Sequence, residues 1–429
     1  MFNFHIIKTK IRAAMRSHPQ RVYLSALLLD LLALAANQLA IHSSTFADAY
    51  SNYVYRVLSL GIGSVTGLLP FSVVELLLYA MILFVLFDFV KQLRRAIRVG
   101  AACVHSERVS QDETHLLAAV ARPLRRFLGH FFLILSTLLV LYVFLCGINY
   151  HRTSFSEEAG LSVTLDEHGT VYDEADLIAL CDYLVTEIND TEAQLAASTI
   201  QVEGACIGQT SETPKPSAAW LWHAGRTGQR AMEKLGQRYR RLSGHYPFPK
   251  PILNTWILSV QQTTGVYSPF TVEANYNRDI AYYDIPFTIC HELSHLRGYM
   301  QEEEANFIGV LATIGADDLY FNYSGYVSAW VYAGNALARI DSTAFATLYA
   351  RINAHTRQDM LYNNAYWKQF EGKPAEAHEQ LNDAYLKMQG QTTGVRSYGH
   401  VTDLMLEYFA KNGTLTQCNS SAVARQTAD

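Results

Sequence analysis

Residues 284–298 have the sequence DIPFTICHELSHLRG, and this stretch predicts a short buried helix with a defined start and end. Asp284 can cap a helix, and Pro286 is tolerated only within a first helical turn. Gly298 is typical of the residue that ends a helix. The positions between the polar residues are apolar or small, as a buried helix requires: Ile289, Cys290, Leu293 and Leu296.

The same helix contains the pattern H-E-x-x-H, which is typical of a catalytic zinc site. His291 and His295 are four residues apart, so a 3.6-residue helical repeat places both imidazoles on one face, where they can bind one ion. Glu292 lies one position further round the helix and can reach a water molecule beside that ion. We therefore expect zinc as cofactor, with Glu292 as the catalytic residue.

A catalytic zinc site uses three protein ligands, so a third ligand is required. Residues 301–307, QEEEANF, predict the acidic start of a second helix. If the site followed H-E-x-x-H-x-x-G-x-x-H, the third ligand would be Gln301, whose amide is a poor zinc ligand. The alternative pattern, E-x-x-A-[DN] of gluzincin-type peptidases, selects Glu302, with Glu304 as a second choice. We expect Glu302 to be the ligand and Asn306, one turn on, to hydrogen-bond a ligating imidazole.

The first third of the chain contains three apolar segments of about 20 residues, the length that crosses a bilayer as a helix. They lie at 22–41, 71–90 and 128–148. The first exceeds an ordinary signal sequence, and no small-x-small cleavage site follows it closely, so we expect it to be retained. We expect a membrane region over 1–148 and a separate domain over 149–429.

The distribution of cations predicts the orientation in the membrane. Lysines and arginines precede the first span and fill the predicted loop 91–127, whereas the segment between the first two spans contains only Arg56. By the positive-inside rule, the N-terminus and that loop lie in the cytoplasm of a multi-pass cytoplasmic-membrane protein. Residues 149–429 then lie outside the cytoplasm. Glu75 and Asp88 lie near the ends of spans and can reach the interface, whereas Asp30, inside the first span, favours helix packing over ion transport.

Composition excludes some classes of protein. The formal net charge of −5 and the pI near 6.3 leave no basic excess for nucleic acid. Six cysteines without a CxxC pair exclude a disulfide scaffold and a cysteine zinc site. Cys290 is expected to be a small buried residue, and pairing among the cysteines of the C-terminal region stays open: Cys181, Cys206, Cys290 and Cys418.

The region after residue 149 is predicted to be mostly helical, so the expected fold class is mainly α with a zincin-like domain and a small β element. Segment 264–274 is the best strand, restricted by Pro269 to a sheet edge, and 203–217 is the clearest loop. Apolar spacing predicts helices at 173–200, 217–243, 285–297, 301–315, 323–340, 342–370, 373–389 and 397–411.

Most of the chain resembles a family of bacterial membrane proteins catalogued as domain of unknown function 3810, which is zincin-like in signature. The matching segments are HELSHLRG at 291–298 and EEEANF at 302–307. Weaker similarity lies at 149–150, 270–275 and within 385–398. By its motif, the resemblance implies a metallopeptidase behind N-terminal spans, but the family itself implies no substrate.

These patterns predict a hydrolase that cleaves peptide bonds of extracytoplasmic proteins or peptides. Zinc on His291, His295 and Glu302 would activate water, and Glu292 would pass its proton to the leaving amine. An extended substrate could lie along segment 266–274. A donor for the developing oxyanion stays open among Tyr323, Tyr326, Arg396, Tyr398 and His400. The alternatives are a catalytically silent zinc-binding module that interacts with envelope partners, and a small transporter or membrane sensor.

Overall fold

The computed structural model describes residues 18–104, 113–161, 172–198, 206–388 and 398–416. The chain forms two compact units. Unit 1 comprises residues 1–43 and 74–148, and unit 2 comprises residues 44–73 and 149–429. Helices account for 75% of the structure and strands for 3%, which confirms the predicted mainly α fold with membrane-type helices and a small sheet.

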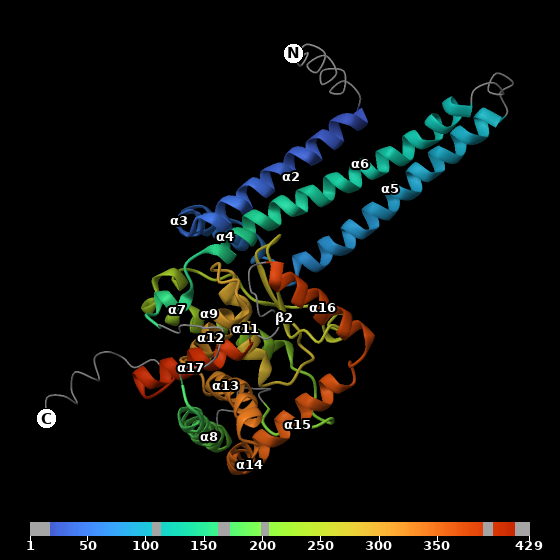
Figure 1. Cartoon of the computed structure of the whole chain (residues 1–429). Coiled ribbons are helices and arrows are strands. Elements are labelled where there is room, and N and C mark those ends of the chain that lie inside the picture. The colour runs from blue at the N-terminus through green and yellow to red at the C-terminus, as the bar shows by residue number, and fades with distance from the viewer. Residues whose placement is uncertain (1–17, 105–112, 162–171, 199–205, 389–397, 417–429) are drawn as a thin grey trace. The chain divides into compact units, whose positions relative to one another are not determined.

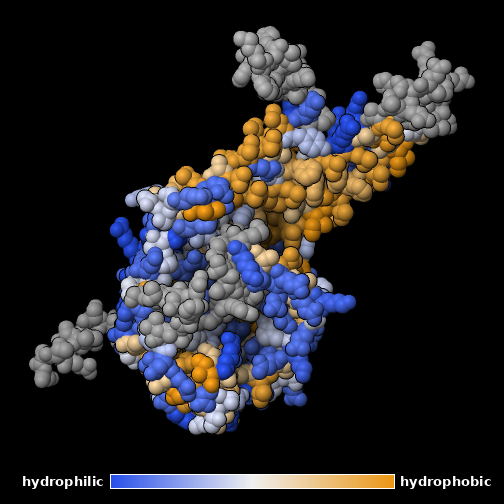
Figure 2. Space-filling model, in the orientation of Figure 1, coloured by the Kyte–Doolittle hydropathy of each residue, from blue (hydrophilic) through white to orange (hydrophobic). Residues whose placement is uncertain are grey.

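Unit 1 is built from three long helices, α2 (His18–His42), α5 (Val73–Val104) and α6 (Glu113–Leu145) (Figure 1). Each is long and apolar enough to cross a membrane, which confirms the three predicted segments. Hydrophobic residues dominate the visible surface of these helices in Figure 2. The predicted loop 91–127 is shorter than expected, because α5 and α6 extend into it from both sides; residues 105–112 lie outside the described residues.

Polar contacts join the helices of unit 1. Asp88 on α5 accepts a hydrogen bond from Gln92 at 2.9 Å, and its other carboxylate oxygen lies 2.8 Å from His130 Nδ1 on α6. Tyr23 on α2 donates to the carbonyl oxygen of Arg125 at 2.7 Å. Asp88 therefore has a partner on a neighbouring helix that sequence reasoning missed, and the contact serves helix packing.

The segment between the first two membrane-type helices belongs to unit 2, although the sequence assigned it to the membrane region. It forms α3 (Ser44–Ala49), a π-helical stretch η1 (Tyr50–Tyr55) and α4 (Arg56–Thr66). The buried Lys250 amine donates to the Thr66 carbonyl oxygen at 2.6 Å and pairs with Glu273, which also accepts from the Val73 N–H at 3.0 Å. Three spans require 44–73 and 149–429 to share one side of a membrane, and this packing agrees.

Helices form most of the rest of unit 2, and most predicted bounds hold within a few residues. The range predicted as one helix, 342–370, is two helices, because the Asn353 side chain accepts from the Thr356 N–H and starts a new helix. The longer helices are α8 (Glu174–Ala197), α9 (Ala218–Arg238), α11 (Asp284–His295), α12 (Glu302–Ile314), α13 (Leu319–Ile340), α14 (Ser342–Arg351), α15 (Ala354–Lys368), α16 (Lys373–Met388) and α17 (Tyr398–Asn412). Shorter pieces are η3 (Gly147–His151), α7 (Phe155–Glu158), η4 (Arg240–Leu242) and α10 (Trp256–Ser259).

A three-stranded sheet lies beside α11. Its strands are β1 (Lys250–Pro251), β2 (Gly265–Ser268) and β3 (Glu273–Tyr276), in the order β1-β3-β2. β2 runs antiparallel to β3, with Gly265 opposite Tyr276, and β1 runs parallel to β3. The predicted single strand 264–274 is therefore a hairpin that turns at 269–272, and its first half is an edge strand of the sheet, as predicted.

Helix α11 is the centre of the core of unit 2. Ile289, Cys290 and Leu293 are fully buried, and α9, α12, α13 and β3 surround the helix. Cys290 is buried as predicted, and Cys181 and Cys206 are also free thiols. Cys418 lies outside the described residues.

Candidate metal centre

A tight turn folds α12 back beside α11. Helix α11 begins at Asp284, but its N-cap is Tyr283, so the predicted capping role of Asp284 is wrong; this acid lies in the first turn, where the helix dipole favours it. The helix ends at His295, and Gly298 follows with φ of 83°. A side chain is strained at such a φ, and an added Cβ would lie 2.9 Å from Arg152 Nη1. The short predicted connection to α12 therefore depends on Gly298.

The turn brings three predicted ligands together. His291 Nε2 lies 3.2 Å from His295 Nε2 and 3.4 Å from Glu302 Oε2, and His295 Nε2 lies 3.9 Å from Glu302 Oε1. Within the described residues, these three form the one group of histidine, cysteine and acidic side chains whose ligand atoms could share an ion.

Burial and mutual charge separate the protonation states of the three side chains. Burial opposes protonation of His291, but the hydrogen bond and charge of Glu302 outweigh it and raise the pKa of His291 to about 9. Burial, followed by the charge of His291, lowers the pKa of His295 to about 4. Burial would raise the pKa of Glu302, but its hydrogen bond with His291 and the charges of both histidines keep this pKa below its usual value. The metal-free site thus holds one proton between His291 and Glu302.

Glu292 lies against the edge strand. Its Oε1 is 4.0 Å from His291 Nε2, and the backbone N–H of Tyr267 donates a hydrogen bond to its carboxylate. A Cβ at Gly265 would lie 2.6 Å from Glu292 Oε1, so only glycine lets the strand approach this closely. Burial raises the pKa of Glu292 to about 8, close to the range that suits a general base at neutral pH.

The two histidines differ in the contacts of their second ring nitrogen. His295 Nδ1 lies 2.6 Å from the carbonyl oxygen of Tyr299, a backbone partner that sequence reasoning missed. The side chain of Asn306 faces His291 and contributes to its raised pKa. His291 Nδ1 and Asn306 Nδ2 are nevertheless buried without a hydrogen-bond partner at bonding distance in the described structure. Asn306 thus lies beside His291, one of the two imidazoles that it was predicted to contact, but the predicted hydrogen bond is not formed.

The alternative ligands point elsewhere. Gln301 is the N-cap of α12, and its amide donates to the Tyr150 carbonyl oxygen at 3.5 Å. Glu304 accepts hydrogen bonds from the backbone N–H groups of Phe155 at 2.6 Å and Ser156 at 3.4 Å. Of the three acidic or amide candidates on α12, only Glu302 faces the histidines.

The candidates for an oxyanion donor find other partners. The Tyr323 hydroxyl donates to Asp359 at 2.7 Å, and the Tyr326 hydroxyl lies 3.2 Å from Thr416 Oγ1. His400 lies on α17 and interacts with Asp403. Arg396 and the side chain of Tyr398 lie outside the described residues.

Two further tyrosines border the centre. The Tyr267 ring lies 5.9 Å from the His295 ring, and its hydroxyl is 3.0 Å from that of Tyr55. Tyr55 also donates to the His295 carbonyl oxygen at 3.2 Å. Sequence reasoning missed both, because Tyr55 precedes the motif by more than 200 residues and lies between predicted spans.

The fold and the centre define a helical protein with three membrane-type helices and a second unit that contains a His-His-Glu cluster. The chain belongs to the family described as protein of unknown function DUF3810, whose model matches residues 50–406. This confirms the family suggested by the sequence. No curated protein and no solved structure match the chain.

Proposed function

We propose that this protein is a membrane-anchored, zinc-dependent metallopeptidase. The observation that carries the proposal is the geometry of the three ligand atoms. Four ligands placed tetrahedrally at 2.0–2.1 Å from zinc lie about 3.3–3.4 Å apart. His291 Nε2 and His295 Nε2 are 3.2 Å apart, and Glu302 lies 3.4 Å from His291 through Oε2 and 3.9 Å from His295 through Oε1. One ligand atom from each residue lies within 4.8 Å of the others, so small side-chain movements would bring the three to the spacing of a zinc site.

The donor set also fits zinc. Two imidazoles and one carboxylate are a known ligand set of catalytic zinc sites, which keep a fourth position open. His291 Nδ1 is buried without a partner, and the Asn306 side chain faces this imidazole. With Nε2 on zinc, the Nδ1–H would donate to the Asn306 Oδ1 after a small rotation of the amide, which would orient the ring. When bound, zinc would polarise a carbonyl group and lower the pKa of water.

The side chains around the cluster are arranged for hydrolysis. Glu292 would accept a proton from the attacking water and transfer it to the leaving amine. The Tyr267 N–H and the close backbone at Gly265 fix the position of that carboxylate. Because Glu292 is buried beside His291, a small displacement of its carboxylate would be costly to the reaction.

The edge strand β2 supports a polypeptide substrate. β2 has β3 on one side only, and it passes directly over Glu292. An extended peptide could lie along the outer edge of β2, where the Tyr267 N–H already bonds Glu292, and present a peptide bond to that carboxylate. We propose that the substrates are extracytoplasmic proteins or peptides, because the cation distribution favours an orientation with unit 2 outside the cytoplasm.

The test uses the full chain in lipid nanodiscs, since unit 2 includes residues 44–73 between two membrane-type helices. A mixed peptide library is incubated with zinc-loaded wild type, Glu292→Gln and the matched control Glu303→Gln. We expect Glu292→Gln to abolish cleavage while binding about one zinc per chain, and Glu303→Gln to cleave like the wild type. Cleavage by Glu292→Gln would refute the general base. A zinc-loaded wild type that cleaves no peptide would favour the silent zinc-binding module.

A further inference from the structure

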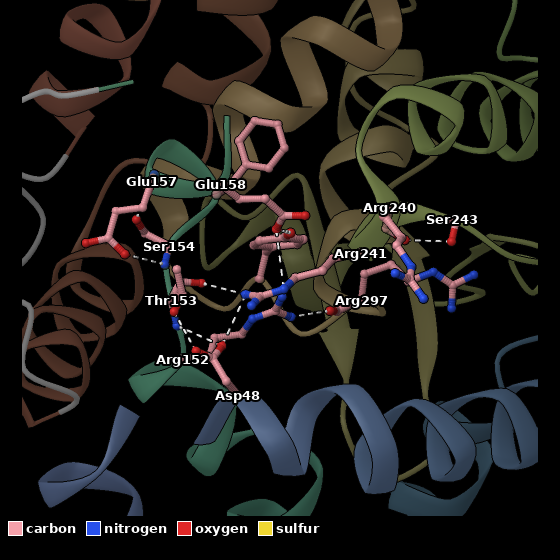
Figure 3. Close-up of polar contacts among 12 residues, drawn as sticks. Asp48, Arg152, Thr153, Ser154, Glu157, Glu158, Arg240, Arg241, Ser243 and Arg297 are labelled. Carbon is pink, nitrogen blue, oxygen red and sulfur yellow. Dashed lines mark hydrogen bonds and ion pairs between the residues drawn. The ribbon is translucent and has the colours of Figure 1, made fainter. Parts of the chain in front are cut away.

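Four arginines surround a hollow in unit 2 on the side of the turn after α11. Arg56 comes from α4, Arg152 from the segment after η3, Arg241 from η4 and Arg297 from the turn itself. Figure 3 shows three of them, Arg152, Arg241 and Arg297, with their polar contacts. Segments distant in the sequence thus bring four guanidinium groups to one place.

The carboxylates around the hollow neutralise only Arg241. Its Nη1 lies 3.1 Å from Asp48 Oδ1, and its Nε lies 3.6 Å from Glu158 Oε2. Both acids have further donors, since Thr153 donates to Asp48 and the Tyr299 hydroxyl donates to Glu158. In the described part of the chain, Arg56, Arg152 and Arg297 form no ion pair with a carboxylate.

Arg152 and Arg297 are buried with part of their hydrogen-bonding capacity unused. Arg152 is 9% exposed and donates from Nη1 to the Arg297 carbonyl oxygen at 2.7 Å; Arg297 is 6% exposed and donates from Nη2 to the His245 carbonyl oxygen at 2.5 Å. Arg152 Nε and Nη2 and Arg297 Nε are buried and have no hydrogen-bond partner. Each guanidinium group stacks on a tyrosine ring, Arg152 on Tyr299 at 4.3 Å and Arg297 on Tyr246 at 4.1 Å, but a ring face does not replace an acceptor for the unpartnered N–H groups. A buried charged donor without an acceptor is costly, so a ligand with acceptor oxygens would suit these groups.

Arg56 lines the hollow and is half-buried. Its Nη2 donates to the carbonyl oxygen of Ser243 at 3.1 Å and to the Ser243 hydroxyl at 3.0 Å. Burial, followed by the charge of Arg297, lowers the pKa of Arg56. Like charges held this close favour binding of an anion between them.

We propose that this arginine hollow, lined by Arg56, Arg152, Arg241 and Arg297, is a binding site for a phosphate group. Guanidinium groups bind phosphate oxygens through paired hydrogen bonds, and a phosphate offers enough oxygens for several arginines. The enclosed space of the hollow is about that of one water molecule, which is smaller than a phosphate group. Phosphate binding would therefore require the hollow to widen through movement of a lining side chain, such as the half-buried Arg56.

Two sources could supply the phosphate: a phospholipid headgroup and a free phosphate. Ser51 and Ser59 line the hollow from η1 and α4, in the segment between two membrane-type helices. The same segment exposes apolar residues, with Val57 67% and Leu68 82% exposed. Either source presents the same group to the arginines, so the experiment separates them.

The test measures thermal unfolding of the full chain in nanodiscs. One arm titrates inorganic phosphate in zwitterionic phosphatidylcholine discs, and the other replaces part of the lipid with phosphatidylglycerol in phosphate-free buffer. The variants are Arg56→Gln and its matched control Arg240→Gln, which removes the same charge at an exposed neighbour outside the hollow. Asn52→Asp, at a residue that lines the hollow, adds a carboxylate without changing the side-chain size.

We expect the wild type and Arg240→Gln to be stabilised in at least one arm. For Arg56→Gln, the ligand concentration that gives half of the maximal rise in unfolding temperature should be at least about tenfold higher than for the wild type. This is the change expected when a paired charge-assisted hydrogen bond is lost. Asn52→Asp should unfold at a higher temperature without ligand and respond less to it. A response to inorganic phosphate identifies free phosphate, and a response confined to phosphatidylglycerol identifies the headgroup. No stabilisation in either arm, or equal stabilisation of Arg56→Gln, would overturn the proposal; neither outcome depends on peptidase activity.

Discussion

Zinc binding should displace one proton from His291. In the metal-free centre the pKa of His291 is about 9, so this imidazole is protonated at neutral pH and shares its proton with Glu302. Zinc binds the neutral imidazole, so the proton must leave. Because the pKa of His291 is raised above that of an ordinary histidine, the proton competes with zinc for this imidazole up to about pH 9. Above about pH 9 the imidazole is neutral and this competition ends. The pKa of His295 is about 4, so this ligand is neutral above about pH 5 and adds no proton.

The size of the effect follows from the pKa of His291. Below pH 9 the apparent zinc affinity should change about tenfold per pH unit, or ~1.4 kcal/mol. Between pH 6.5 and 8.5 the affinity should therefore rise by roughly 80-fold. Two histidines with ordinary pKa values would give a rise of only about fourfold over the same interval.

The assay is competition for zinc with a chelator of known pH dependence, on the full chain in nanodiscs. It uses the Glu292→Gln background, because the pKa of Glu292 is about 8 and its own titration would otherwise contribute. Glu302, the larger source of the raised pKa of His291, is intact in that variant, whereas the smaller contribution of the Glu292 charge is lost. We therefore expect a rise below roughly 80-fold but well above about fourfold. A rise in zinc affinity of only about fourfold between pH 6.5 and 8.5 would refute the proton shared by His291 and Glu302. A rise far above 100-fold would mean that a second ligand also loses a proton when zinc binds.

Three substitutions test other parts of the structure. Gly265→Ala places a methyl group 2.6 Å from Glu292 Oε1 and should lower peptide cleavage more than tenfold with zinc content unchanged, measured on the loaded protein. Lys250→Met leaves Glu273 buried without its cation and should cost roughly 3–5 kcal/mol, seen as a large fall in the unfolding temperature. Burial raises the pKa of Glu304 to about 8, so the folded protein keeps a proton on this side chain at pH values where the unfolded chain has lost it. The free energy of unfolding of the wild type should therefore fall between about pH 5 and pH 8. Glu304→Gln, which cannot ionise, should lack the part of this decrease that is due to Glu304.

Each of these expectations has a control. Gly61→Ala changes a glycine with open space at its Cβ and should leave cleavage unchanged; equal losses in the two glycine variants would contradict the role of the close strand. Adding Glu273→Gln to Lys250→Met should recover a large part of the lost stability, because it removes the uncompensated charge. If the pH dependence of unfolding were the same in Glu304→Gln and wild type, Glu304 would already be ionised in the folded protein.

The parts of the molecule set by local sequence were predictable. Apolar runs located the three membrane-type helices, and the spacing of His291 and His295 with Glu302 located the ligand cluster. These features depend on residues within one or two helical turns of each other, or on a single tight turn at Gly298. Periodicity could not show the break at Asn353, because a capping side chain ends one helix and starts another without interrupting the apolar pattern.

Long-range contacts account for what the sequence did not reveal. Tyr55 contacts the end of α11 across more than 200 residues, and the buried pair of Lys250 and Glu273 ties the segment 44–73 to the sheet. The arginine hollow likewise joins four separate segments. Segment 44–73 lies between two predicted spans, and its position alone assigned it to the membrane region. Only the folded structure shows which residues of segment 44–73 pack against the rest of unit 2.

The most direct test of the zinc site is metal analysis of the full chain after zinc loading and removal of free metal. Wild type, His291→Ala and Glu302→Ala are compared at pH 8, with Glu303→Ala as the matched control on α12. We expect about one zinc per chain in the wild type and in Glu303→Ala, and a large loss of zinc in the other two variants. Equal zinc in all four proteins, or none in the wild type, would contradict the assignment of His291, His295 and Glu302 as the metal ligands.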